Sequence, residues 1–298
     1  MLQNRKYKLG IVSILMAGTL WGSMGIFVRK LAGNGLGSLE IVALRSLGAL
    51  FMTGAILLIY NRKLFRIKMK DIWCFIGTGI LSLTFFNYCY FQTIITTSLA
   101  TAAIMLYTAP VFVVLMSFFL FKEKLTGRKC AAMMTAFLGC GLVTGAISLG
   151  GMSVSAKGMM FGLGSGIGYA LYSIFSRYAL EKGYSSFTIS FYTFLFSTVG
   201  TFFLVDLQTM TGKLLADSLM EDLIYIFGIA LIATVLPYLF YTYGLKSVEN
   251  GRASIIASIE PVVATLVGII LFHETLTISG VLGIFCVLTA IVMLNRTG

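Results

Sequence analysis

The chain contains 298 residues, of which 58% are hydrophobic and only 11% are charged, and its formal net charge is +11 at pH 7. A water-soluble domain carries about 25% charged residues, so the charged residues of this chain are too few to cover a soluble surface. The composition therefore excludes a soluble globular protein, and the positive charge points to basic loops beside anionic lipid rather than to nucleic acid.

Apolar stretches of about 20 residues recur along the chain, and each is long enough to cross roughly 30 Å of hydrocarbon. They lack strict alternation of apolar and polar residues, so helices rather than strands are predicted. Ten helical spans are predicted, at residues 9–29, 38–60, 72–92, 98–121, 129–147, 157–179, 186–206, 223–244, 251–272 and 278–295. The loops between them are short, and the longest is expected around residues 207–221. The predicted fold is an all-α membrane protein with ten transmembrane helices.

Lysine and arginine fall mainly in alternate loops, on the side that also holds the N-terminal Arg5, Lys6 and Lys8. Cytoplasmic loops carry such an excess, so both termini are predicted to lie in the cytoplasm. The first apolar run continues to Val28 without a small-x-small cleavage site, so it is interpreted as a retained helix. Short loops and the lack of an organelle signal favour a bacterial inner membrane.

Two stretches of the chain are related by a shift of 151 residues. Ala102 to Thr126 and Ala253 to Thr277 share 10 identities in 25 ungapped positions, among them Pro110 with Pro261. A repeat with this period is too long for a solenoid unit and indicates two equivalent halves of the chain.

The halves are placed at residues 1–148 and 149–298, with five predicted spans in each. Five is an odd number, so the second half enters the membrane in the opposite direction and the repeat is inverted. Arg29 and Arg177, which align at a shift of 148 residues, are accordingly predicted on opposite sides. Inverted repeats of this kind place a substrate site near the bilayer midplane, so a central cavity between the halves is expected.

Three groups of residues carry a resemblance to a known family. They are Leu20-Trp21-Gly22, then Tyr107-Thr108-Ala109-Pro110-Val111 with Lys122-Glu123-Lys124-Leu125-Thr126, and Glu260-Pro261-Val262 with His273-Glu274-Thr275-Leu276-Thr277. With these motifs the sequence resembles the ten-helix drug/metabolite transporter superfamily, in its EamA-like branch, over essentially the whole chain. The resemblance implies secondary transport, often export of amino acids or related metabolites, through a central cavity formed by both halves. It is specific for the family and weak for the substrate.

Glu260 is predicted near the middle of the ninth span, where its repeat partner is Ala109. An ionised carboxylate at the bilayer centre costs about 2.5–3.5 kcal/mol, so this side chain should face a partner or a wet cavity. One interpretation is a protonatable group coupled to transport, or a ligand for a substrate amine. The other is a structural ion pair with Arg45, which also lies within a span. The neighbouring Pro261 interrupts the backbone hydrogen bonds of the helix and can leave a carbonyl group free to bind the substrate.

Asn87 and Tyr238 align at the 151-residue shift, in the third and eighth spans. Such a polar pair suits a cavity wall, and interhelical hydrogen bonds, worth about 0.6 kcal/mol each, are the alternative. Trp21, Tyr107 and Tyr169 are predicted at mid-span depth and are candidates for stacking or cation–π contact with a substrate. Packing of these rings against lipid is the alternative.

Glu123 and Glu274 follow the ends of their spans and are interpreted as structural loop anchors. The five cysteines lie in or beside apolar runs without a C-x-x-C pattern, and His273 is the only histidine. Neither a metal site nor any other cofactor is therefore predicted.

The sequence predicts a secondary active transporter that exports small metabolites such as amino acids or amine-containing compounds. Its expected partners are a small-molecule substrate, the lipid bilayer, and protons or a counter-substrate, without nucleic acid. No nucleotide-binding motif or catalytic constellation occurs, which disfavours ATP drive within the chain and a membrane-embedded enzyme. A nucleotide-sugar or organic-phosphate exchanger is an alternative that needs several basic cavity residues. A non-transporting receptor or scaffold is a further alternative, disfavoured by the polar residues within the spans.

Overall fold

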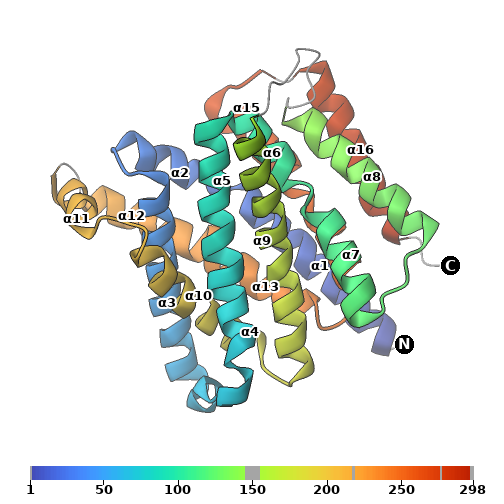
Figure 1. Ribbon diagram of the computed structural model, residues 1–298, viewed down its shortest axis with the longest axis horizontal. Coiled ribbons are helices and arrows are strands. Elements are labelled where there is room, and N and C mark those ends of the chain that lie inside the picture. The colour runs from blue at the N-terminus through green and yellow to red at the C-terminus, as the bar shows by residue number, and fades with distance from the viewer. Residues whose placement is uncertain (1, 145–154, 217–218, 276, 296–298) are drawn as a thin grey trace.

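The computed structural model describes residues 2–144, 155–216, 219–275 and 277–295. Helices joined by short turns make up most of these residues, and no strand occurs among them. The helices form one bundle, and α11 lies apart at its edge (Figure 1).

Seven segments of the described chain are long and apolar enough to cross a membrane. They comprise α1 with α2 (Leu2–Gly22, Met24–Gly33), α3 (Ser38–Tyr60), α4 with α5 (Ile72–Ile76, Phe85–Thr96), α6 with α7 (Leu99–Leu106, Ala109–Phe121), α9 (Ala156–Glu181), α12 with α13 (Leu219–Ala230, Leu236–Gly244), and α14 with α15 (Asn250–Ala257, Glu260–Phe272). Each of the seven overlaps one of the predicted spans.

The other three predicted spans are also helical, but their helices are shorter. They are α8 (Gly127–Val143), α10 (Ser186–Phe202) and α16 (Ile278–Asn295). The end of the fifth predicted span, residues 145–147, lies outside the described residues. α8 and α16 run side by side along one edge of the bundle (Figure 1).

The prediction of a long loop at residues 207–221 is wrong for most of its length. After a bend of 100°, the chain continues from α10 into a further helix, α11 (Leu207–Ala216). Asp206 precedes it and caps its start, because its carboxylate accepts a hydrogen bond of 3.1 Å from the Gln208 amide. Met210 packs into the bundle while most neighbouring side chains are exposed. This short helix, with few buried residues, lacks the long apolar run by which the spans were predicted.

Two of the spans are broken at equivalent positions of the repeat. α6 gives way to α7 at Pro110, and α14 gives way to α15 at Pro261, each proline being the second residue of the new helix. Proline lacks an amide hydrogen and clashes with the preceding turn, so the sequence itself accounts for both breaks. The far ends match as well, because Lys122 and His273 close α7 and α15 in the left-handed conformation, with φ of 56° and 55°.

The spans predicted as third and eighth each contain a π-helical segment, Gly77–Thr84 before α5 and Leu231–Val235 before α13. The two segments end at the same position of the 151-residue repeat. A π-helical turn widens the helix and re-aims the side chains that follow it, and such turns are frequent at functional sites. Here they precede the helices that carry Asn87 and Tyr238.

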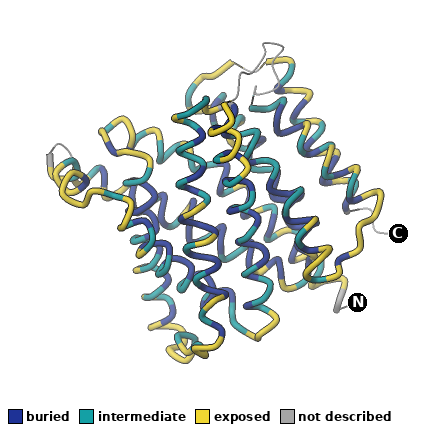
Figure 2. Tube along the Cα trace, viewed as in Figure 1, coloured by how far each residue is buried: buried dark blue, intermediate teal, exposed yellow. Residues whose placement is uncertain are grey.

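Glycines allow the closest contacts between helices. α8 and α16 meet at Gly139, where an added methyl group would lie 2.9 Å from the Gly283 carbonyl oxygen and 2.9 Å from Cβ of Cys286. In lipid, van der Waals packing replaces the hydrophobic effect as the force between helices, so such contacts matter for stability. Figure 2 shows the buried positions along the inner sides of the bundle and the exposed ones at the loops and on α11.

We expect Gly139→Ala to lower the free energy of unfolding by about 1–3 kcal/mol, because the backbone of α16 cannot move aside for the methyl group. Gly212→Ala in α11 is the matched control, since no described atom lies within 4 Å of its added methyl group. There the higher helix propensity of alanine should stabilise the protein by up to about 1 kcal/mol. Thermal unfolding midpoints in one detergent measure both effects, and equal midpoints would contradict a tight α8–α16 contact.

Candidate functional site

The site is built where helices from both halves of the chain converge. On α9, Tyr169, Tyr172 and Ser173 share one face, because residues three and four apart lie together on a helix. On α13, Tyr238 and Tyr241 lie on one face for the same reason. Sequence spacing explains why each helix presents these side chains together, and the packing of α9 against α13 brings the two faces into contact.

Trp21, near the end of α1, is at the centre of an aromatic cluster. Its ring centroid lies 5.2 Å from that of Tyr238, 5.4 Å from Tyr241 and 6.3 Å from Tyr169. Tyr172 completes the cluster, with its ring 4.8 Å from that of Tyr238. These separations are typical of favourable aromatic pairs. Trp21 is only 7% exposed, so the cluster faces the interior of the bundle rather than lipid.

Two tyrosine hydroxyl groups of this cluster are fixed by hydrogen bonds between α9 and α13. The hydroxyls of Tyr172 and Thr242 are 2.7 Å apart, and those of Ser173 and Tyr241 are also 2.7 Å apart. Buried tyrosine hydroxyls need such partners, and these bonds orient the rings that line the site.

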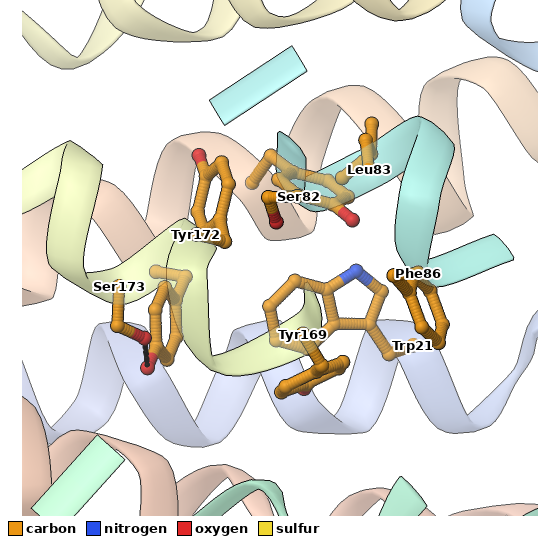
Figure 3. A pocket seen from close by; sticks show the side chains of 9 residues that line it. Trp21, Ser82, Leu83, Phe86, Tyr169, Tyr172 and Ser173 are labelled. Carbon is orange, nitrogen blue, oxygen red and sulfur yellow. Dashed lines mark hydrogen bonds between the residues drawn. The ribbon is translucent and has the colours of Figure 1, made fainter. Parts of the chain in front are cut away.

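A small cavity remains between the rings. It is lined by Trp21, Ser82, Leu83, Phe86, Tyr169, Tyr172, Ser173, Tyr238 and Tyr241. Figure 3 shows Trp21 and Phe86 toward one end of it, and Tyr172 and Ser173 toward the other. Its free volume is about 10 Å³, room for about one water molecule. The space is therefore contracted, and a metabolite can enter it only when helices move apart.

Arg45, on α3, is buried beside this cluster, with 4% of its surface exposed. Its guanidinium group donates to the side-chain oxygen of Asn87 at 3.3 Å and to the sulfur of Met24 at 3.4 Å. Among the described residues, no carboxylate lies within ion-pair distance of it. A guanidinium group has five N–H donors, so these two long contacts leave it short of acceptors.

Glu260 is the first residue of α15 and therefore lies at the break between α14 and α15. The Tyr169 hydroxyl lies close enough to influence its carboxyl group, and the charge of Arg45 acts on that group from beyond contact distance. The start of a helix also favours a negative charge. The ion pair between Arg45 and Glu260, one of the two interpretations of Glu260 from the sequence, is not formed as a direct contact in the described structure, and the two charges interact across a gap.

The predicted site residues gather in two neighbouring groups, an aromatic cluster with Trp21, Tyr169 and Tyr238, and a charged group with Arg45, Asn87 and Glu260. Tyr107 lies at the equivalent break, between α6 and α7, and packs with Cys140 and Val262 instead. It is within electrostatic range of Glu260.

Phe86 and Ser173 belong to the site although the sequence did not indicate them. Ser173 follows Tyr169 by four residues, so helical spacing is a signal that finds it. Phe86 is one of 24 phenylalanines in an apolar chain, and nothing in its local pattern distinguishes it from the others.

The fold and these two groups define a class of protein, a multi-pass helical membrane protein with polar and aromatic residues buried where its helices meet. The model of the EamA-like transporter family matches the chain twice, at residues 8–145 and 156–296. The chain belongs to the EamA-like transporter family.

Individual relatives agree with this assignment. An uncharacterized transporter of Archaeoglobus fulgidus is 28% identical over 296 residues, which are 98% of each chain. An uncharacterized transporter of Helicobacter pylori strain J99 is 31% identical over 262 residues, which are 84% of this chain and 81% of the relative. A solved crystal structure shares the fold with a TM-score of 0.77 over 96% of both chains, at 15% identity. The family points to a membrane transporter of a small molecule rather than to an enzyme.

Proposed function

We propose that the protein is a secondary active transporter that exports small amine-containing metabolites, and that amino acids are its main substrate class. One observation carries the proposal. The cation Arg45 and the carboxylate Glu260 come from different halves of the chain and interact without direct contact. Removing charges from water without a close partner is costly, so a ligand that brings the complementary charges stabilises this arrangement.

An amino acid supplies both complementary charges. Its carboxylate accepts hydrogen bonds from Arg45, and its ammonium group donates to Glu260, while its side chain rests against Trp21 and the neighbouring tyrosines. A simple amine binds to Glu260 and to the faces of the aromatic rings in the cluster. The gap between the two protein charges is then the space that the substrate fills.

An organic-phosphate exchanger fits the site less well. Phosphate groups are commonly held by several arginine or lysine side chains. Arg45 is the only such side chain in the aromatic cluster and the charged group as described above, so a substrate with one carboxylate matches the supply of positive charge better.

In the proposed mechanism the chain crosses the membrane ten times, as two inverted repeats with both termini in the cytoplasm. The end of α7 then faces the cytoplasm and the end of α15 faces the outside. The two halves exchange conformations in turn, which exposes the site to one side and then to the other. A proton bound at Glu260, or a counter-substrate in the same place, supplies the driving gradient.

The test is counterflow in proteoliposomes containing the purified protein. Labelled amino acids, primary amines and sugar phosphates are offered in parallel, with and without a pH gradient. We expect exchange of at least one amino acid or amine, with a rate that responds to the gradient, and none of the phosphates. Exchange of phosphates alone, or of no compound in the panel, would contradict the proposal. Protein-free liposomes correct for passive leakage.

A further inference from the structure

Glu123 closes one end of the bundle at the contact between α7 and α14. Its carboxylate accepts hydrogen bonds from the amides of Asn250 at 2.7 Å and Gly251 at 3.2 Å, the first two residues of α14. Lys129 adds an ion pair of 2.8 Å. All four residues are buried. A carboxylate on the unpaired amides of a helix start makes strong, charge-assisted hydrogen bonds.

Arg177 ties α9 to the same place. Its Nε donates to the side-chain oxygen of Asn250 at 2.9 Å, and a second guanidinium nitrogen donates to the Val248 carbonyl at 2.6 Å. Helices α7, α9 and α14 are thereby joined, and this end of the bundle is sealed.

The repeat places equivalent residues at the other end, but there they do not meet. Glu274 and Arg29 correspond to Glu123 and Arg177, and α6 corresponds to α14. Glu274 pairs with Arg29 instead, and their side chains are 47% and 52% exposed. Leu99, the first residue of α6, is 62% exposed, and its amide has no acceptor among the described residues. In the described structure α7 packs on α14, whereas α15 makes no comparable contact with α6.

The backbone around the two glutamates is nearly the same. The Glu123 amide donates to the Ser117 carbonyl at 3.2 Å, and the Glu274 amide donates to the Gly268 carbonyl at 3.1 Å. The residue before each glutamate adopts the left-handed conformation. The two carboxylates therefore project from matching positions, and what differs is the partner that each one holds.

We propose that Glu123 and Glu274 are reciprocal latches of two alternating states, an inference that rests on the proposed transport by alternating access. In the state described here Glu123 holds the start of α14, and the opposite end is unlatched. In the other state Glu274 leaves Arg29 and binds the first amides of α6, while Arg29 takes the carbonyl of Thr97, the repeat equivalent of the carbonyl bound on the sealed side. The two glutamates are gates in this proposal, rather than loop anchors.

The two latches are unequal. Lys129 strengthens the Glu123 latch, and its repeat equivalent is Gly280, which has no charge. Asn250, which binds Arg177, has Leu99 as its equivalent. The protein without substrate therefore rests mainly in the state that Glu123 closes.

Backbone hydrogen exchange in lipid nanodiscs, without substrate, tests the latches. We expect Glu123→Gln to make amides of residues 249–258 exchange about tenfold faster, since a bond to a charged acceptor is lost. At the same time amides of residues 98–106 should exchange more slowly, because the opposite latch closes. Adding Glu274→Gln to that variant should abolish the slowing at 98–106.

Gly251→Ala is a second way to open the same latch. An added methyl group there would lie 2.7 Å from Cε of Lys129 and 3.0 Å from the Val114 side chain, so it disturbs the contact and keeps the carboxylate. Glu221→Gln, which removes an exposed carboxylate paired with Lys30, is the control and should change neither segment. Faster exchange at 249–258 with no change at 98–106, in both Glu123→Gln and Gly251→Ala, would overturn the proposal. Because no substrate is used, this result is independent of whether transport is found.

Discussion

Glu260→Gln is expected to weaken the binding of an amine-containing substrate about tenfold or more, because the hydrogen bond to a charged group is replaced by a neutral one. The same change should remove the pH dependence of binding that this carboxyl group contributes, since an amide does not titrate. The reason lies in the position of Glu260 at the break before α15, where the nearby Tyr169 hydroxyl and the distant charge of Arg45 act on its carboxyl group. No protein cation neutralises it at contact distance in the described structure.

Tryptophan fluorescence measures this effect directly. The chain has two tryptophans, of which Trp21 lies in the aromatic cluster and Trp73 is 41% exposed on α4. In a Trp73→Phe background the signal comes from Trp21 alone. Titration with the substrates found by counterflow, at several pH values, then gives the dissociation constants. Glu181→Gln, at the exposed end of α9, is the control. Unchanged affinity and pH dependence in Glu260→Gln would show that this carboxylate neither binds the substrate nor couples transport to protons.

Arg45→Met is expected to weaken the binding of amino acids about tenfold or more, while amines without a carboxylate keep their affinity. It should leave the thermal unfolding midpoint unchanged or raise it. Among the described residues, the buried guanidinium group has Asn87 and Met24 as its hydrogen-bonding partners, and burying it with these two contacts is costly. Replacing buried charges by apolar side chains of similar volume is often stabilising.

Measuring both substrate affinity and the thermal unfolding midpoint distinguishes two possible roles of Arg45. A substrate ligand gives the pattern above, whereas a structural residue that ties α3 to α5 gives a lower midpoint and equal losses for amino acids and amines. Asn87→Leu is the matched comparison, because it removes the acceptor and leaves the charge buried. We expect it to lower the midpoint, since an unsatisfied buried charge is destabilising.

Much of the fold follows from patterns that are visible in the sequence. Long apolar runs locate the helices, and proline explains why the chain breaks at Pro110 and Pro261. The repeat also identified Glu260 as a candidate site residue. Its equivalent in the first half is the uncharged Ala109, although the residues around the two positions are similar. These features are local in the sequence, so they can be read without knowledge of the packing.

What escaped prediction depends on contacts between distant segments. Arg45 looked like the obvious partner for Glu260, yet its side chain binds Asn87 and Met24. Which charges touch is decided by helix rotation and tilt, and composition does not encode these. The partners of Glu123 were not predicted for the same reason, since the α14 amides that it binds lie more than a hundred residues away along the chain. The helix α11 escaped because it lies across the bundle edge instead of spanning it.

The inequality between Lys129 and Gly280 has a kinetic consequence. In the proposed mechanism, a carrier that rests mainly with one end latched opens its site to the other compartment more often than to the latched side. The apparent dissociation constant is the intrinsic one divided by the fraction of protein in the competent state, so half-saturation occurs at a lower concentration on that face. When no gradient drives transport, the maximal rate divided by the half-saturating substrate concentration must be the same for transport in either direction. The maximal rate of transport from that face is therefore lower by the same factor as its half-saturating concentration. If the proposed latches operate, this one lysine sets which compartment the carrier responds to at low substrate concentration.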